Sequence, residues 1–146
     1  MVQPDRRPRS RYAPEAVPVD LASPDVRARL GPAALKAFFT LAERWKLRDE
    51  DARALLGGVT NGPYYVMKGN PNRALDIDRL TRVSYLIGIF KALNILYSEA
   101  LADEWVRRPN TNPLFAGRTP LAYMIRGGVP AMVNVRRLLD ARRAGR

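Results

Sequence analysis

Hydrophobic residues recur along most of this chain at the three- and four-residue spacing of an α-helix. The clearest stripe places Leu35, Phe38, Phe39, Ala42 and Trp45 on one helical face. We find no alternation of apolar and polar residues that would indicate a strand, and no internal repeat. The pattern therefore predicts an all-α fold, with a helix-turn-helix helical bundle followed by a small C-terminal helical domain.

Capping residues, prolines and glycines predict where the helices begin and end. Ser23 followed by Pro24 and Asp25 has the features of a helix start, and Gly31-Pro32 is expected to break that segment and begin another. Residues 99–107 are expected to continue the preceding helix or to form a separate helical turn. Further helices are predicted over residues 49–56, 60–68, 76–97, 119–126 and 130–144, with breaks at Gly57-Gly58 and Gly127-Gly128.

Three segments follow from this pattern. Residues 1–22 contain four Pro and four Arg with little periodicity, which indicates a flexible basic arm. Residues 23–98 form the helix-turn-helix domain and residues 99–146 the C-terminal domain. With 146 residues, of which 47% are hydrophobic, the chain holds one domain or two very small ones that share a core.

The composition excludes several kinds of chemistry. The chain has neither cysteine nor histidine, so disulfides, Cys/His zinc sites and imidazole bases are ruled out. Its 14 acidic residues show no spaced pair in an apolar setting. We therefore expect no enzymatic activity, no metal and no cofactor.

The charge of the chain favours an anionic partner. The net charge is +11, and 21 of the 25 basic residues are arginine, which suits bidentate binding of phosphate or carboxylate. An arginine-rich composition without a binding role is the alternative. No signal peptide is recognised, and the apolar run from Val83 to Tyr97 is too short to span a bilayer. We expect a cytoplasmic protein without a membrane partner.

Residues 49–68 have the dimensions of a helix-turn-helix, with Ala52 allowing a close helix crossing and Gly57-Gly58 forming the turn. A plain structural corner of the same shape is the alternative. If the unit binds DNA, its second helix enters the major groove. The candidate DNA contacts are then Thr60, Asn61, Tyr64, Tyr65, Lys68, Asn70, Asn72 and Arg73.

The span from about Leu30 to Leu96 resembles the Xre-type helix-turn-helix half of Xre/MbcA/ParS-type antitoxins. The resemblance rests on the segments LRDEDARALLGG and LDIDRLTRVSYLIGIFKAL. In relatives an Arg-Trp pair precedes the Lys-Gly of the second short helix, whereas this chain has Val66 and Met67 there. Gly62-Pro63 also falls within the first turn of that helix. The resemblance implies DNA binding, and these departures imply that binding is altered or lost.

The C-terminal third resembles the toxin-binding domain of the same antitoxins more closely. The matching residues, in order, are Trp105, Pro109-Asn110, Leu114, Gly117, Thr119-Pro120-Leu121, Gly127 and Gly145. The resemblance implies a type II antitoxin that covers the active site of a RES-type toxin, which consumes NAD or transfers ADP-ribose, and that represses its own operon. The candidate toxin contacts are Asn110, Leu114, Phe115, Arg126, Arg136, Arg137, Arg142, Arg143 and Arg146.

Alternatives to this interpretation remain open. One alternative is a DNA-binding transcriptional regulator without a toxin partner. Another is a helical scaffold with neither activity. For the C-terminal arginines, the alternative is that they merely solvate the outer face of a helix. We also expect a homodimer, because the segment from Val83 to Tyr97 is apolar on nearly all sides and paired helix-turn-helix units match two DNA half-sites.

Overall fold

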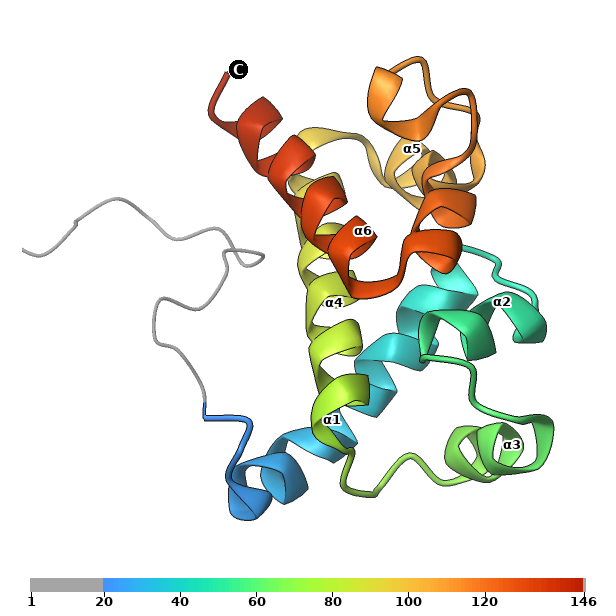
Figure 1. Cartoon of the computed structure of the whole chain (residues 1–146), viewed down its shortest axis with the longest axis vertical. Coiled ribbons are helices and arrows are strands. Elements are labelled where there is room, and N and C mark those ends of the chain that lie inside the picture. The colour runs from blue at the N-terminus through green and yellow to red at the C-terminus, as the bar shows by residue number, and fades with distance from the viewer. Residues whose placement is uncertain (1–19, 146) are drawn as a thin grey trace, which may run out of the picture.

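The computed structural model describes residues 20–145, and within that range it contains six α-helices, two short 3₁₀ turns and no strand. The all-α prediction is confirmed (Figure 1). Residues 1–19, which make up most of the predicted basic arm, and the candidate toxin contact Arg146 lie outside the described residues. The elements are α1 (Pro24–Arg44), α2 (Asp49–Leu55), α3 (Asn61–Gly69), α4 (Ile77–Leu96), α5 (Glu99–Glu104), η1 (Trp105–Arg107), η2 (Pro113–Phe115) and α6 (Pro120–Arg143).

Helix α1 is continuous through Gly31-Pro32, so the predicted break at this dipeptide is wrong. A proline ring ordinarily clashes with the β-carbon of the preceding residue in a helix, and Gly31 has no β-carbon. Gly31 is also buried where the backbone of residues 73–75 crosses α1. A β-carbon at position 31 would lie 2.8 Å from the Cα of Ala74 and 3.0 Å from the backbone nitrogen of Leu75. The glycine therefore permits a close crossing of two chain segments.

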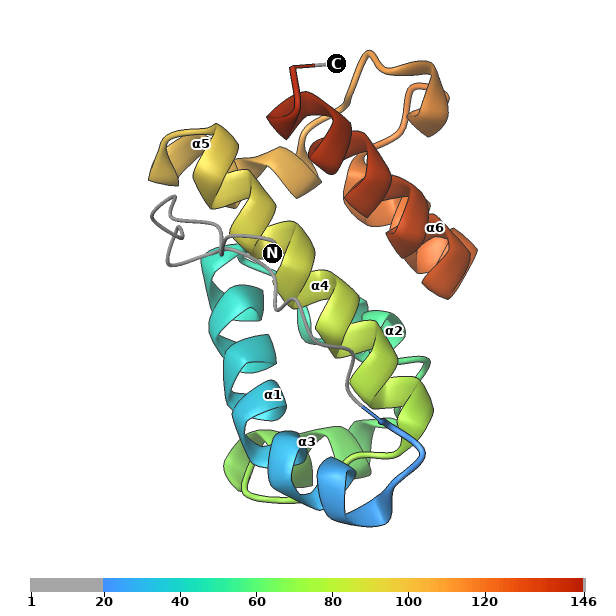
Figure 2. The same cartoon turned by 90° about the vertical axis from the view of Figure 1, so that its left-hand side faces the viewer.

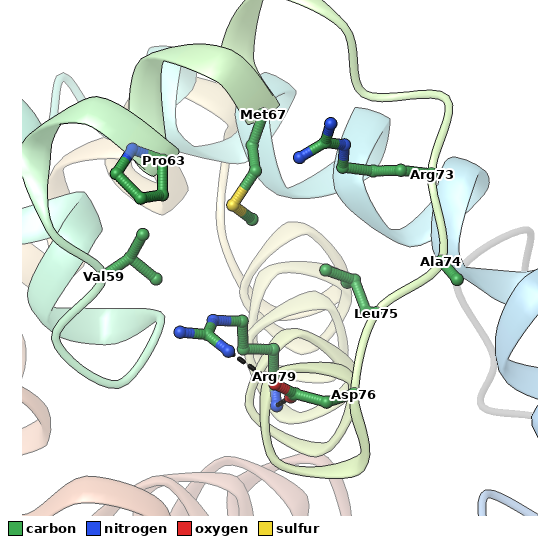
Figure 3. A pocket seen from close by; sticks show the side chains of 8 residues that line it. All are labelled: Val59, Pro63, Met67, Arg73, Ala74, Leu75, Asp76 and Arg79. Carbon is green, nitrogen blue, oxygen red and sulfur yellow. Dashed lines mark hydrogen bonds and ion pairs between the residues drawn. The ribbon is translucent and has the colours of Figure 1, made fainter.

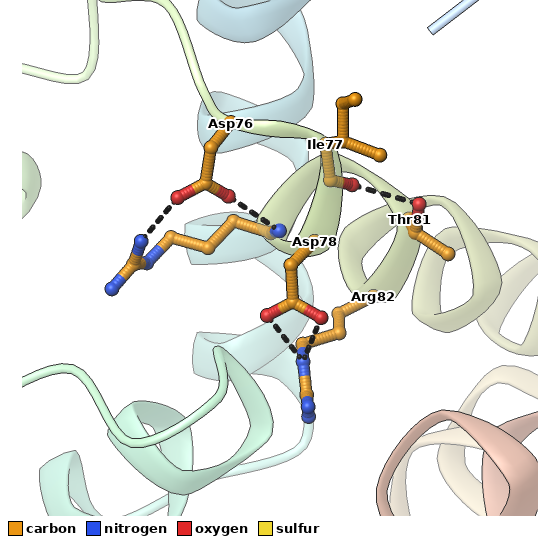
Figure 4. Close-up of polar contacts among 6 residues, drawn as sticks. Asp76, Ile77, Asp78, Thr81 and Arg82 are labelled. Atoms are coloured by element: carbon orange, nitrogen blue, oxygen red, sulfur yellow. Dashed lines mark hydrogen bonds and ion pairs between the residues drawn. The ribbon is translucent and has the colours of Figure 1, made fainter. Parts of the chain in front are cut away.

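Helices α4 and α6 begin at capping side chains at the first residues of their predicted ranges, whereas Thr60, the expected cap of α3, makes no side-chain capping bond. The Asp76 carboxylate accepts a hydrogen bond from the backbone N–H of Arg79 at 2.8 Å and opens α4 (Figure 4). One turn along, the Arg82 guanidinium pairs with Asp78 at 3.0 Å. The hydroxyl of Thr119 likewise accepts a bond from the backbone N–H of Ala122 at 3.1 Å. Each bond satisfies a helix N-terminal donor that would otherwise lack a partner.

Helix α4 lies between α1 and α6 and holds the molecule together (Figure 2). Its side chains Val83, Leu86, Ile89 and Leu93 are fully buried. They join one hydrophobic core that extends from Leu35 to Leu139, so the two predicted domains share a single interior. The cover for α4 comes largely from helices of the same chain. The apolar character of this helix therefore does not by itself require a second copy.

Helix α6 bends sharply at Gly128, which has φ 64° and ψ −145°. This region of backbone space is essentially restricted to glycine. The predicted break at Gly127-Gly128 is thus confirmed as a corner, after which the second arm runs back along α4 (Figure 1). On that arm Met132, Val135 and Leu139 are fully buried. None of the helices in the described range is long and apolar enough to cross a membrane.

Candidate functional site

The connector before α6 is braced by three aromatic rings. The ring of Phe115 meets that of Trp105 edge-on at 5.9 Å between centroids, and that of Tyr123 edge-on at 5.4 Å. This T-shaped geometry is favourable for aromatic pairs beyond the area that they bury. Phe115 is only 1% exposed. This candidate toxin contact therefore supports the connector from beneath and does not present its ring at the surface.

Two asparagine side chains fix the backbone of the same connector. The side-chain oxygen of Asn110 accepts a hydrogen bond from the backbone N–H of Asn112, and that of Asn112 accepts one from Leu114, each at 2.9 Å. Ala116 and Gly117 then both adopt left-handed backbone conformations, with φ 50° and 82°. Because its oxygen is used within the turn, Asn110 acts first as a structural residue. Leu114 remains partly exposed above the core.

Three of the candidate arginines are engaged within the chain. Arg136 lies over Gly88 of α4 and pairs with Asp140 at 3.1 Å. Arg142 donates a hydrogen bond to the hydroxyl of Tyr97 at 2.9 Å. Arg143 also lies 4.0 Å from Asp140. Arg136 and Arg142 thereby join α6 to α4 and to Tyr97, the residue that follows α4, whereas Arg143 is exposed and pairs only within α6. Arg136 and Arg142 are less available to a partner than their spacing on the helix indicates.

Other arginines of the C-terminal part are available at the surface. Arg126 and Arg137 are exposed, and neither has a hydrogen bond or ion pair with any described residue. The same holds for Arg118, which is not among the candidate toxin contacts predicted from the sequence. The only sequence signal for Arg118 is its place directly after Gly117, in a turn whose shape does not follow from residue type alone. Arg107 is likewise exposed and has no partner among the described residues, so the structure leaves four unpaired guanidinium groups on this part of the molecule, those of Arg107, Arg118, Arg126 and Arg137.

Helices α2 and α3 are joined by a turn in which Gly57 and Gly58 have φ 94° and 87°. Helix α3 is attached through Tyr64 and Met67, which are 1% and 6% exposed. The ring of Tyr64 is therefore part of the interior and does not face a binding partner. The remaining DNA candidates, Thr60, Asn61, Tyr65, Lys68, Asn70, Asn72 and Arg73, are exposed.

One carboxylate ties α3 to the start of α2. Asp49 accepts hydrogen bonds from the hydroxyls of Tyr65 and Tyr64, at 2.8 and 3.0 Å, and from the ammonium group of Lys68 at 3.1 Å. The bond from Tyr65 contributes most, followed by those from Lys68 and Tyr64, to lowering the pKa of Asp49. Conversely, burial and the bond to Asp49 raise the pKa of Tyr64. The charge of Lys68 is thereby largely matched within the chain.

A shallow hollow of about 240 Å³ separates α3 from the beginning of α4 (Figure 3). Val59, Met67 and Leu75 supply apolar walls, and the guanidinium groups of Arg73 and Arg79 border it. Arg79 is paired with Asp76. Helix α3 is therefore packed less completely than the helices around α4, and its outer face projects from the molecule.

The charge of the α2–α3 region differs from that of the whole chain. Residues 48–79 contain five basic and five acidic residues and are neutral, although the chain carries +11. The acidic residues include Asp49, Glu50 and Asp51 in the first turn of α2. On α3 itself, Tyr65 and Val66 are 49% and 55% exposed. The outer face of this helix therefore combines apolar surface with little excess positive charge.

Comparison with known proteins places these observations in a family. Residues 91–145 match the model of the antitoxin Xre/MbcA/ParS C-terminal toxin-binding domain. The protein described as uncharacterized protein y4oB of Sinorhizobium fredii (strain NBRC 101917 / NGR234) is 39% identical over 129 residues, which cover 88% of this chain and 98% of the relative. No solved structure is significantly similar. The match begins within α4 and includes the connector, the corner at Gly128 and both arms of α6.

Proposed function

We infer the function from one premise: this chain belongs to the family of the Sinorhizobium fredii protein y4oB, and its residues 91–145 are an Xre/MbcA/ParS-type toxin-binding domain. This domain supports an antitoxin role in a toxin–antitoxin system, with a toxin as partner. We propose that the partner is a RES-type toxin, which consumes NAD or transfers ADP-ribose, and that the C-terminal part covers its active site. We also propose that the chain has no enzymatic activity of its own and that it acts in the cytoplasm.

The exposed arginines support a partner with an anionic cleft. A cleft that binds the pyrophosphate of NAD must supply a favourable environment for negative charge, and arginine is suited to enter it. Arg126 lies before the corner of α6 and Arg137 on its second arm, and both are unpaired among the described residues. Leu114 adds apolar surface on the connector. The observation that carries the proposal is the match of the toxin-binding domain to this part of the chain.

Co-expression with the product of the adjacent reading frame tests the proposal. We expect the chain to restore growth and to co-purify with that product. A charge-reversal pair, Arg126→Glu with Arg137→Glu, should weaken both effects. The matched control is Arg29→Glu with Lys36→Glu, which changes the net charge equally on exposed positions of α1. If the adjacent product is harmless or does not bind the wild-type chain, the proposal is wrong.

Point variants are preferable to a truncation after Pro113. Such a truncation removes α6, whose Met132, Val135 and Leu139 are fully buried in the shared core. Loss of neutralisation would then report unfolding and would not identify a contact surface. The exposed arginines avoid this difficulty, because replacing them leaves the interior unchanged.

A second proposed activity is binding of the chain to its own operator. The observation that favours it is the outline of α2 and α3, with an exposed α3 that projects beside the hollow. The neutral charge of residues 48–79 predicts few phosphate contacts from this unit and a shallow dependence of affinity on salt. Gel-shift titrations of the upstream promoter duplex against a shuffled duplex, at several salt concentrations, test this. Equal affinity for the two duplexes would exclude specific reading, and the chain would then lack a repressor function of its own.

A homodimer is also proposed, because paired helix-turn-helix units match the two half-sites of a symmetric operator. Light scattering during size-exclusion chromatography measures the mass directly. A mass near twice the 16.4 kDa of the chain supports the dimer, and a mass near 16.4 kDa at micromolar concentration excludes it.

A further inference from the structure

We propose that Arg118 makes a principal ionic contact between this chain and its toxin, through an anionic group at the entrance of the toxin's active site. The inference rests on the proposed antitoxin function and names a residue that the sequence pattern did not. Arg118 lies inside the part of the chain that matches the toxin-binding domain. It is exposed and has no hydrogen bond or ion pair with the described residues through its side chain.

The backbone that carries Arg118 is held from both sides. Its N–H donates to the carbonyl of Phe115 at 2.9 Å, and its own carbonyl accepts from the N–H of Asn110 at 3.4 Å. The next residue, Thr119, caps α6. The backbone from which this side chain extends is therefore fixed before a partner arrives, which lowers the backbone entropy lost on binding.

Buried aromatic rings support the turn from within. Phe115 lies three residues before Arg118 and is enclosed between Trp105 and Tyr123. Between Phe115 and Arg118 the backbone passes through Ala116, whose left-handed φ of 50° is uncommon for a residue other than glycine. Arg118 therefore extends into solvent from a turn whose backbone is held by the buried ring of Phe115 and by the left-handed conformation of Ala116.

Arg107, Arg126 and Arg137 share the exposure of Arg118 and its lack of a partner among the described residues, whereas the remaining described arginines of α6 are engaged. Arg136, Arg142 and Arg143 are engaged with Asp140 or Tyr97, so their binding to a partner would break contacts within the chain. Arg118 loses no intramolecular contact of this kind. Leu114, four residues earlier on the same turn, supplies neighbouring apolar surface. A guanidinium group beside an apolar side chain is a common composition for residues that dominate binding energy.

The chemistry of a guanidinium defines its partner group. Its planar set of donors matches two oxygens of a carboxylate or a phosphate. The group on the toxin is therefore either an acidic side chain or a phosphate of NAD bound in the cleft. These sources share one chemistry and are separated by whether NAD changes the contribution of Arg118.

The test uses the full-length chain and the purified product of the adjacent reading frame, with affinity measured by calorimetry. We expect Arg118→Ala to weaken binding by about 10- to 100-fold, the range for a hydrogen-bonded charge. Arg118→Lys should recover part of this loss, because it keeps the charge and lacks the planar fork. The control Arg29→Ala should leave the affinity unchanged, and the melting temperatures of all variants should agree with that of the wild type.

Each outcome has one meaning. If the loss at Arg118 changes when NAD is added, the partner group is a phosphate, and if it does not, the group is an acidic side chain; both support the contact. Wild-type binding with equal affinity for Arg118→Ala and Arg29→Ala, both with and without NAD, overturns the assignment of Arg118 and leaves the antitoxin function intact. Absence of wild-type binding overturns the proposed function, and the assignment fails with it.

Discussion

The guanidinium group of Arg136 on α6 occupies the space above Gly88 on α4, where a β-carbon would collide with its Nη1 atom and lie 3.1 Å from its Cζ. Gly31 also occupies a close crossing, but there the neighbour is the backbone of Ala74 and Leu75. The two glycines thus face neighbours of very different mobility. An arginine side chain rotates away at modest cost, whereas a packed backbone does not.

Replacing these glycines by alanine should have different effects on stability. We expect Gly31→Ala to lower the free energy of unfolding by about 2–3 kcal/mol, because overpacking must displace backbone. For Gly88→Ala the gain in helix propensity, about 1 kcal/mol, offsets the displacement of Arg136. Its net effect should stay within about 1 kcal/mol. Urea denaturation of both variants measures this, and equal losses would contradict the distinction.

Gly128→Ala should destabilise the corner of α6. An alanine at φ 64° and ψ −145° is strained by about 1–3 kcal/mol. The second arm of α6 would then shift against α4, and binding to the toxin should weaken together with thermal stability. Gly69→Ala is the control, since a β-carbon there meets open space and φ is not positive. A melting temperature for Gly128→Ala equal to that of Gly69→Ala would show that the corner relaxes without strain.

The attachment of α3 should depend on acid pH through Asp49. Because its pKa is lowered in the folded chain, the carboxylate stabilises the fold above its unfolded pKa of about 3.9, and this contribution is lost as pH falls through the lower folded pKa. Protection of α3 amides, taken relative to their intrinsic exchange rates, should therefore fall below about pH 4. Asp49→Asn should remove this dependence and accelerate exchange at neutral pH. Glu50→Gln, the same charge change in the same turn, should preserve the acid dependence.

Tyr64 should make the stability of α3 depend on pH in the opposite direction, at alkaline pH. Its pKa is raised, so its contribution is complete below the unfolded value of about 10 and decreases as pH rises above it. Tyr64→Phe keeps the buried ring and removes the hydroxyl. Protection of α3 amides, taken relative to their intrinsic exchange rates, should fall between about pH 9 and 11 in the wild type and stay constant in Tyr64→Phe. Constant protection in the wild type would contradict this expectation.

Gly62→Ala should strengthen α3. Gly62 is helical, has open space at its β-carbon position and lacks a positive φ, so alanine is accommodated without strain. The gain should be about 0.5–1 kcal/mol, because alanine restricts the unfolded chain more than glycine does. Thermal denaturation and α3 hydrogen exchange measure it. A lower melting temperature would mean that α3 requires the freedom of glycine at this position.

Local signals in the sequence predicted the helices well where the cause is local. Asp76 and Thr119 cap their helices through neighbours three residues away, and Gly128 forms the predicted corner. The failure at Gly31-Pro32 has two causes: a glycine before the proline lets the helix continue, and the distant backbone of residues 73–75 requires a glycine at that crossing. Helix propensity and proline placement contain no information about such a crossing.

The candidate partner surface was harder to predict for the same reason. Arg136 and Arg137 are adjacent and chemically identical, yet one is held over Gly88 and the other is exposed. Phe115 is a candidate toxin contact by sequence, but its packing against Trp105 and Tyr123 places it in the interior. Arg118 becomes prominent only through the rigidity of its turn. Each of these properties depends on pairs of residues that no single sequence spacing defines.

Because α4 packs against α1 on one side and α6 on the other, the end of the molecule proposed to meet the toxin and the end proposed to meet DNA belong to one cooperative structure. If a cellular protease unfolded either end, the other end would lose the support of the shared core. The antitoxin would then be lost as a unit, so that release of the toxin and release of the operator occur in the same event. The rate at which α4 unfolds would then determine when the toxin and the operator are released.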